Sequence, residues 1–338
     1  MLAYLGRRLV IMVLTLAVIS VVAFVVIELP PGDFVSWRIE QMSERGMASQ
    51  EEIDALRRRY GLDRSMAYRY VRWITRFVQG DMGHSLSWDQ PVWTLFRSRF
   101  PMTVLITALS LLFTWALAIP IGILSAVRRY SVTDVVWTFV GFIGLATPNF
   151  LIALVFMYLS YEFFPDIEVG GLLSHRYVAA PWTAAKVLDL LGHLWIPVVI
   201  VGTAGTAGTM RVIRANLIDE LRKPYVEMAR AKGLSEARLI FRYPVRVAIN
   251  PFLSTVGWVL PLLIAGETIT AIVLGMPTAG PLFLQALLRQ DMQVAGAYVM
   301  LVSALTLIGT RISDFLLVVA DPRIRMEGSG EQGAEKAS

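Results

Sequence analysis

The sequence predicts an all-α polytopic membrane protein. It would have six transmembrane helices, a helical extracytoplasmic insertion after the first, and a short cytoplasmic helix between the fourth and the fifth. Of the 338 residues, 56% are hydrophobic and 17% are charged, whereas a soluble domain is about 45–50% apolar and about 25% charged. Six stretches also approach or exceed the roughly 20 apolar residues that cross a bilayer. A one-sided distribution of basic residues in the short loops completes the prediction.

The predicted spans are 9–29, 102–127, 135–164, 194–212, 247–274 and 294–320. The first follows Arg7-Arg8, as the apolar part of a signal peptide would. It is too long for one, however, and Pro30-Pro31-Gly32-Asp33 follows it in place of a small-residue cleavage site. We therefore expect it to be retained as a transmembrane helix.

The orientation follows from basic residues near the span ends, which favour the cytoplasmic side. Arg7 and Arg8, Arg128 and Arg129, the loop 211–246, and Arg323 with Arg325 all fall on one side. Both termini are then cytoplasmic in a bacterial-type inner membrane. The formal charge of +5 is explained by this topology, so membrane lipid, and not nucleic acid, is the expected partner.

The chain lacks the residues for several kinds of chemistry. It has no cysteine, and its three histidines are far apart, so neither disulfides nor a metal centre are expected. None of its four lysines lies in a phosphate-binding G-x-x-x-x-G-K-[ST] loop. H-E-x-x-H and G-x-S-x-G are missing too. We expect no enzyme activity, catalytic residue, cofactor or metal in this chain.

The sequence divides into four regions. They are a first helix with a basic N-terminus (1–29), an extracytoplasmic insertion (30–100), a five-helix core with a polar loop at about 214–246 (101–325), and a disordered tail (326–338). In the insertion, Ser49 and Glu52 form a capping box for a helix that ends at Gly61. A second helix, 66–78, places Tyr70, Trp73 and Phe77 on one face. The insertion is either a cap over the outer face or a docking surface for an external partner.

Three spans carry helix-breaking or small residues. They are Gly141, Gly144 and Thr147-Pro148-Asn149 in span three, Gly202, Gly205 and Gly208 in span four, and Gly257, Pro261 and Gly266 in span five. Small residues permit close helix packing, and broken helices are tolerated where they line a cavity. Either packing or a translocation path explains them. Thr147, Asn149 and Glu267 are the candidate path residues, unless Glu267 lies at the interface; Arg311 and Asp314 are spaced to pair.

The loop between spans four and five contains a short amphipathic stretch, from Glu220 to Lys232, which Gly233 ends. It is too short and too polar to cross a membrane. A helix lying on the lipid surface is one interpretation. Its apolar face is small, however, which favours insertion into a groove of a partner protein.

Within this stretch, Glu227-Met228-Ala229 followed by Gly233 resembles the EAA loop of ABC-transporter permeases. The chain as a whole is similar to the first permease subunit of the dipeptide/oligopeptide type. The matching strings are LPPGD (29–33), RYGLD (59–63), GDMGHSLS (80–87), ARAKGLS (229–235), Pro251 and DPRIR (321–325). Met228 departs from the usual alanine, and Met276–Pro281 replaces the usual Trp-Pro-Gly stretch.

The resemblance implies one half of the translocation pathway of an ATP-driven importer. The partners would be a second homologous permease, two cytoplasmic ATPase domains that hold ATP and Mg, and an extracytoplasmic solute-binding protein that delivers peptides. The implied coupling residues are Glu227, Met228, Ala229, Arg230, Lys232 and Gly233. The alternative for Glu227 is an ordinary solvated acid, and the alternative for Arg230 and Lys232 is that they are ordinary positive-inside residues.

Alternatives remain open from the sequence. The same architecture could carry sugars, opines, glutathione or metal chelates. A self-contained secondary transporter or channel would carry intramembrane charge chains or inverted repeats, and few charges and no repeat are visible in the spans. An intramembrane enzyme has no catalytic constellation to support it.

Overall fold

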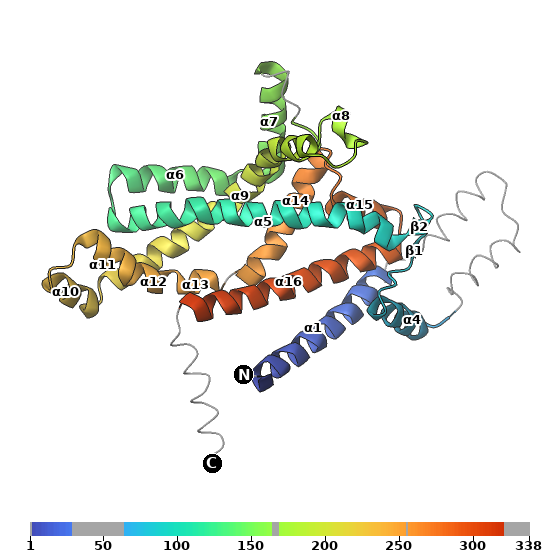
Figure 1. Cartoon of the computed structure of the whole chain (residues 1–338), viewed down its shortest axis with the longest axis horizontal. Coiled ribbons are helices and arrows are strands. Elements are labelled where there is room, and N and C mark those ends of the chain that lie inside the picture. The colour runs from blue at the N-terminus through green and yellow to red at the C-terminus, as the bar shows by residue number, and fades with distance from the viewer. Residues whose placement is uncertain (1, 29–63, 164–168, 255, 321–338) are drawn as a thin grey trace, which may run out of the picture. The chain divides into compact units, whose positions relative to one another are not determined.

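The structure, a computed structural model, describes residues 2–28, 64–163, 169–254 and 256–320 (Figure 1). They form two compact units, Met1–Thr103 with Pro277–Leu307 and Val104–Met276 with Ile308–Ser338. Helices dominate both, as predicted. In the described ranges the sheet is limited to β1 (His84–Ser85) and β2 (Gln90–Pro91), which pair antiparallel with His84 opposite Pro91. The predicted helix from Ser49 to Gly61 and the tail 326–338 lie outside the described residues.

Several described helices are long and apolar enough to cross a membrane, which supports the membrane-protein prediction. They are α5 (Val92–Val127), α9 (Ala184–Leu221), most of α16 (Met292–Ala320), and the pair α6 (Val132–Ala146) and α7 (Asn149–Phe163) taken together. In α1 (Leu2–Glu28) and α14 (Val256–Val273) the apolar stretches are shorter, Val10–Val25 and Val259–Val273. The count of six spans therefore stays a prediction.

The span predicted over 135–164 is bent by 97° between α6 and α7, at the helix-breaking residues Thr147-Pro148-Asn149 that the sequence marks there. Pro148 causes the break. A residue before proline is pushed out of the helical region, and Thr147 adopts φ −91° and ψ 118°. We call this bend, Thr147 to Asn149, the elbow.

The boundaries of spans four and five also differ from the prediction. The fourth helix, α9, covers Ala184–Leu221 instead of 194–212. Span five begins with two short helices, α12 (Pro244–Ala248) and α13 (Asn250–Leu253), before α14. The expected breaks at Gly257, Pro261 and Gly266 do not occur, since all three lie inside α14. The two glycines instead permit close approach: a Cβ would lie 2.5 Å from Thr310 Oγ1 at Gly257 and 2.7 Å from Asn149 Nδ2 at Gly266.

In the first unit, α4 (Met66–Val78) confirms the helix predicted over 66–78. Its aromatic face packs on α1 and α16: Tyr70, Trp73 and Phe77 join a cluster with Phe24 and Met300. The Tyr70 hydroxyl is 2.8 Å from Ser20 Oγ. Apolar packing therefore holds α4 against α1 and α16.

A second anchor in the first unit is the buried carboxylate of Asp291, which precedes α16. It accepts hydrogen bonds from Ser85 Oγ at 2.6 Å and from the Ser87 amide at 3.0 Å. These bonds tie the loop that carries β1 and β2 to the turn after α15 (Ala279–Leu288). Helix α15 was not predicted from the sequence.

The second unit is built along α9, with α6, α7, α12 and α14 packed against it (Figure 1). The small-residue face predicted on span four packs against α5 through Gly202 and Gly205. A Cβ at Gly202 would lie 2.5 Å from Phe113 Cδ1 and 3.0 Å from the Ser110 carbonyl oxygen, both of α5. Thr114 Oγ1 donates a hydrogen bond to the Gly202 carbonyl at 2.9 Å. The prediction of close helix packing here is confirmed.

We expect Gly202→Ala to destabilise this unit by about 1–3 kcal/mol, the usual cost of overpacking a close contact. The thermal stability of the purified chain in detergent measures the effect. Gly208→Ala is the matched control on the same helix, because nothing lies within 4 Å of its Cβ position. That substitution should be neutral or slightly stabilising, since alanine favours helix over glycine. Equal melting temperatures for the two variants would contradict the prediction.

Candidate functional site

The segment with the predicted coupling residues is a helical hairpin of α10 (Pro224–Ala231) and α11 (Glu236–Arg242). The predicted single helix from Glu220 to Lys232 is wrong, because Glu220 and Leu221 still belong to α9. Pro224 explains the boundary: it holds Lys223 in an extended conformation, φ −78° and ψ 145°, and starts the new helix at its first position.

The hairpin is seated on an apolar core. Val226 is fully buried and Ala229 nearly so, and both pack with Leu217 of α9. Leu239 and Ile240 of α11 and Val245 and Ala248 of α12 complete this cluster. The thin apolar face that the sequence showed is thus used inside the molecule and is not available to lipid.

The opposite face of α10 is open to solvent. Glu227, Met228, Arg230, Lys232 and Gly233 are all exposed. The Met228 side chain is 62% exposed, and the Phe241 side chain at the end of α11 is 64% exposed. The structure therefore brings five of the six predicted coupling residues together on one surface, while Ala229 lies beneath it.

Gly233 forms the turn between the two helices. Its φ of +79° lies in the left-handed region, which a residue with a Cβ adopts only at a cost. Across the turn, Arg230 donates to Glu236 through Nε at 2.6 Å and Nη2 at 3.2 Å. This ion pair raises the pKa of Arg230 and lowers the pKa of Glu236. Arg230 is therefore engaged within the hairpin itself.

The base of the hairpin contains a buried acid, Glu220. It accepts hydrogen bonds from Lys223 Nζ at 2.5 Å and from the Tyr225 hydroxyl at 2.6 Å. Burial, together with the adjacent Glu220 carboxylate, raises the pKa of the Tyr225 phenol. The phenol therefore stays protonated at neutral pH and keeps donating to Glu220, which fixes the exit of the chain from α9.

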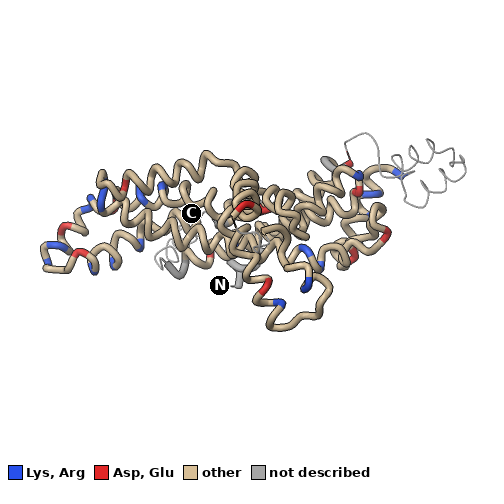
Figure 2. The backbone as a smooth tube through the Cα atoms, turned by 90° about the horizontal axis from the view of Figure 1, so that it is seen from above, with Lys and Arg blue, Asp and Glu red and all other residues tan. Residues whose placement is uncertain are grey.

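Charged residues are dense where α10 and α11 lie, at the left of Figure 2. Arg222, Lys223, Glu227, Arg238 and Arg242 of this segment are all exposed. The surface thus carries more basic than acidic side chains, together with two exposed large apolar side chains, Met228 and Phe241. Such a combination suits a protein groove more than a hydrocarbon surface.

The candidate path residues lie elsewhere in the same unit. Thr147 ends α6 and donates its hydroxyl to the Ile143 carbonyl at 2.7 Å, and Asn149 starts α7. Asn149 lies against Gly266, the neighbour of Glu267 in α14. The Glu267 side chain is fully buried within the protein, and its depth in the membrane stays a prediction. Arg311 and Asp314 pair as predicted, with Nη1 and Oδ2 3.1 Å apart.

Sequence reasoning missed the ion pair between Asp134 and Arg214, which joins α6 to α9. A signal was available, because Ser131 and Asp134 have the spacing of a helix-capping motif. The pairing with Arg214, 80 residues away, could not be read from the sequence. Within the described ranges, no group of three or more His, Asp or Glu could hold a metal ion.

Comparison with known proteins identifies the family of this chain. Residues 118–326 match the family model described as "Binding-protein-dependent transport system inner membrane component". The chain belongs to this family. Residues 1–107 match the model of the N-terminal part of such membrane components. The elbow, the hairpin and α14 all fall within the first match.

Individual relatives of this inner membrane component cover almost the whole chain. The oligopeptide transport system permease protein AppB of Bacillus subtilis is 32% identical over 96% of this chain and 99% of its own length. The di/tripeptide transport system permease protein DppB of Pseudomonas aeruginosa is 31% identical, with the same two coverages. The dipeptide transport system permease protein DppB of Escherichia coli K12 is 28% identical, again with the same coverages. The chain is thus a transport permease subunit.

The buried face of the hairpin can be tested separately from its exposed face. Val226→Ala removes two methyl groups from a fully buried site, and should weaken the hairpin by about 1–2 kcal/mol. Met228→Ala changes an exposed side chain and should leave it intact. Amide hydrogen exchange over residues 224–242 of the purified chain reports both. Faster exchange in Met228→Ala than in Val226→Ala would mean that the buried and exposed faces are assigned the wrong way round.

Proposed function

We propose that this chain is one permease subunit of an ATP-driven importer that takes up peptides. The observation that carries the proposal is the arrangement of the hairpin. Its apolar side chains pack against α9, whereas Glu227 and Met228 are exposed to solvent. A surface that is polar and rigidly seated suits docking into another protein. The names of the relatives, which are oligopeptide, di/tripeptide and dipeptide permeases, support peptides as the cargo.

The proposed assembly contains a second homologous permease, two ATPase domains that bind ATP and Mg, and a solute-binding protein outside the membrane. In it, Glu227, Met228, Arg230, Lys232 and Gly233 form or shape the surface that enters the ATPase groove, and Ala229 helps to seat it. Thr147, Asn149 and Glu267 lie along the path of the peptide. When the ATPase domains close, the hairpin moves and α9 transmits that motion to the spans.

In this assembly both termini and the hairpin are cytoplasmic, and the insertion 30–100 is outside. The absence of native cysteine makes labelling of single cysteines a clean test. Ser235 in the hairpin and Thr75 in α4 are both exposed. In sealed, right-side-out vesicles, a membrane-impermeant maleimide should label Thr75→Cys from outside and reach Ser235→Cys only after permeabilisation. Labelling of both variants from the same side would overturn the orientation.

The coupling role is tested by transport in proteoliposomes that contain the whole complex. Glu227→Lys reverses an exposed acid on a largely basic surface, and a like charge at an interface can cost several kcal/mol. We expect peptide uptake to fall by at least tenfold. Glu227→Gln, the matched control, loses the charge without reversing it and should retain more uptake. Gly233→Pro should also abolish uptake, because proline fixes φ near −65° where the turn requires +79°.

The same experiment tests the cargo and the partners. Wild-type complex should take up di- to oligopeptides only when ATP, the binding protein and the ATPase subunits are all present. Pull-down of the ATPase subunits by each variant shows whether the loss arises at docking. Wild-type uptake rates in both Glu227→Lys and Gly233→Pro would show that the hairpin is not the coupling element. Uptake of sugars, opines, glutathione or metal chelates in place of peptides would change the cargo alone.

A further inference from the structure

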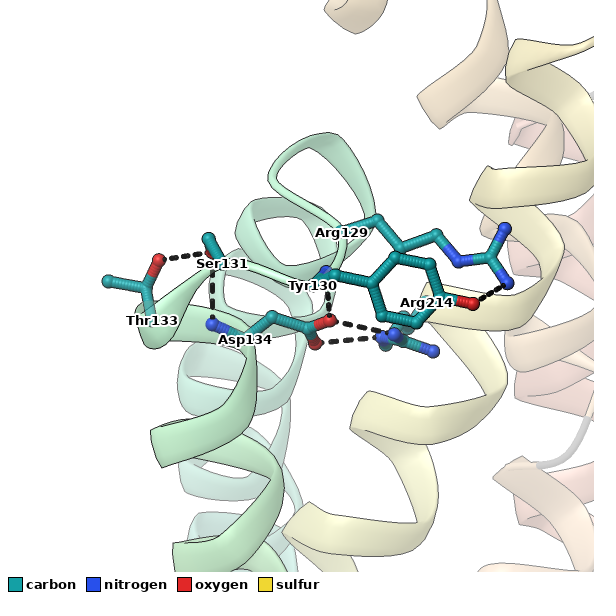
Figure 3. A network of polar contacts seen from close by, with 6 residues as sticks. All are labelled: Arg129, Tyr130, Ser131, Thr133, Asp134 and Arg214. Atoms are coloured by element: carbon teal, nitrogen blue, oxygen red, sulfur yellow. Dashed lines mark hydrogen bonds and ion pairs between the residues drawn. The ribbon is translucent and has the colours of Figure 1, made fainter.

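A partly buried ion pair between Asp134 of α6 and Arg214 of α9 connects the two helices (Figure 3). Arg214 donates to both carboxylate oxygens, through Nε to Oδ1 at 2.9 Å and through Nη2 to Oδ2 at 2.7 Å. Asp134 is 3% exposed. Two parallel bonds fix the angle between the groups as well as their distance, so α6 can neither slide nor rotate on α9 without breaking them.

The turn before α6 is shaped around the same carboxylate. The Tyr130 amide donates to Asp134 Oδ2 at 2.9 Å, and Ser131 Oγ accepts from the Asp134 amide at 3.3 Å (Figure 3). Tyr130 has a φ of +63°, which is unfavourable for a residue with a side chain. The guanidinium of Arg129 covers its ring at 4.4 Å. The turn from α5 into α6 is thus held in an unfavourable conformation by contacts that converge on Asp134.

Beyond the ion pair, α6 follows α9 closely in the antiparallel direction. Gly141 faces Ala207 and Met210 of α9, and Gly144 faces Thr203 so closely that a Cβ would lie 2.9 Å from its Cγ2. An added Cβ at Gly144 would force a neighbour to shift, and one at Gly141 would lie tightly against Met210. A displacement of α9 therefore carries α6 with it for as long as the pair is held at the Asp134 end.

The pair formed by α6 and α9 connects the hairpin at one end with the candidate path residues at the other. Arg214 is three residues before Leu217, which is buried in the core that seats the hairpin. At the far end, α6 runs into the elbow, where Asn149 lies against Gly266 of α14. Packed contacts thus run without interruption from the hairpin, through Leu217, Arg214 and α6, to the candidate path residues.

We propose that Asp134 and Arg214 are positioning residues that make α6 and α9 move as one body, so that motion of the hairpin reaches the elbow. This inference rests on the proposed function, and it adds the component that transmits the motion. Without the ion pair, the hairpin would still dock and α9 would still move, but α6 would lag behind. ATP would then be hydrolysed with little transport.

The test is the number of peptides taken up per ATP hydrolysed by the reconstituted complex of this chain with its permease, ATPase and binding-protein partners. Arg214→Gln and Asp134→Asn each remove the ion pair, and the double variant removes both charges. Arg211→Gln is the matched control: Arg211 is about one turn away on α9, where it stacks over Phe142 of α6 at 5.1 Å. Arg214→Lys keeps the charge and loses the paired geometry, so it serves if the other variants assemble poorly.

We expect uptake per ATP to fall at least tenfold in Arg214→Gln and in Asp134→Asn. The double variant should show no further fall, because each single substitution already removes the same interaction. Arg214→Lys should fall by a few fold, and Arg211→Gln should stay within twofold of wild type. The proposal is overturned if uptake per ATP is unchanged in the variants, including Arg214→Lys; a proportional fall of uptake and hydrolysis is one such result. It is also overturned if the effects of the two single variants multiply in the double variant. Failure of the proposed function is distinguishable, because the wild-type complex itself would then take up no peptide.

Discussion

Close approach of helices along α9 is the constraint on which the second unit depends. Gly202 leaves space for Phe113 of α5, and Gly144 of α6 leaves space for Thr203 of α9. Apolar burial drives no association between helices in lipid, where the surroundings are equally apolar. Short interhelical distances, which maximise dispersion contacts, must stabilise the arrangement instead. Polar contacts such as Thr114 with the Gly202 carbonyl then fix the register of the helices.

The hairpin follows a different rule, because its stability comes from a soluble-type core. Val226, Leu239 and Leu217 are fully buried there, as in a small water-soluble domain. Because this core ends on α9, a force on the exposed face of α10 acts on a long helix and not on a flexible loop. Asp134 and Arg214 extend the same rigid connection to α6. Packing thus explains both how the surface is presented and why α9 and α6 are held together.

Much of this was readable from the sequence, and the failures have physical causes. The membrane class followed from composition, and α4 followed from the spacing of Tyr70, Trp73 and Phe77. The bend at Pro148 was visible as a sequence feature, but its angle depends on tertiary contacts. Gly257 and Gly266 were misjudged as breaks, because a glycine that loosens an isolated helix also permits a neighbour to approach. In the candidate site, the exposed face of α10 was predicted, whereas the pairing of Arg230 with Glu236 required the turn at Gly233.

The length of α9 has a consequence for where a partner can bind. The helix has 38 residues, which is about 57 Å at 1.5 Å per residue. Its uncharged part runs from Leu194 to Met210. From Arg211 to Leu221 it continues for a further 16 Å or so, whereas the polar headgroup layer on one side of a bilayer is only about 5–8 Å deep. An upright α9 would carry the hairpin past the lipid headgroups into water. A protein that grips the hairpin would then never have to displace lipid.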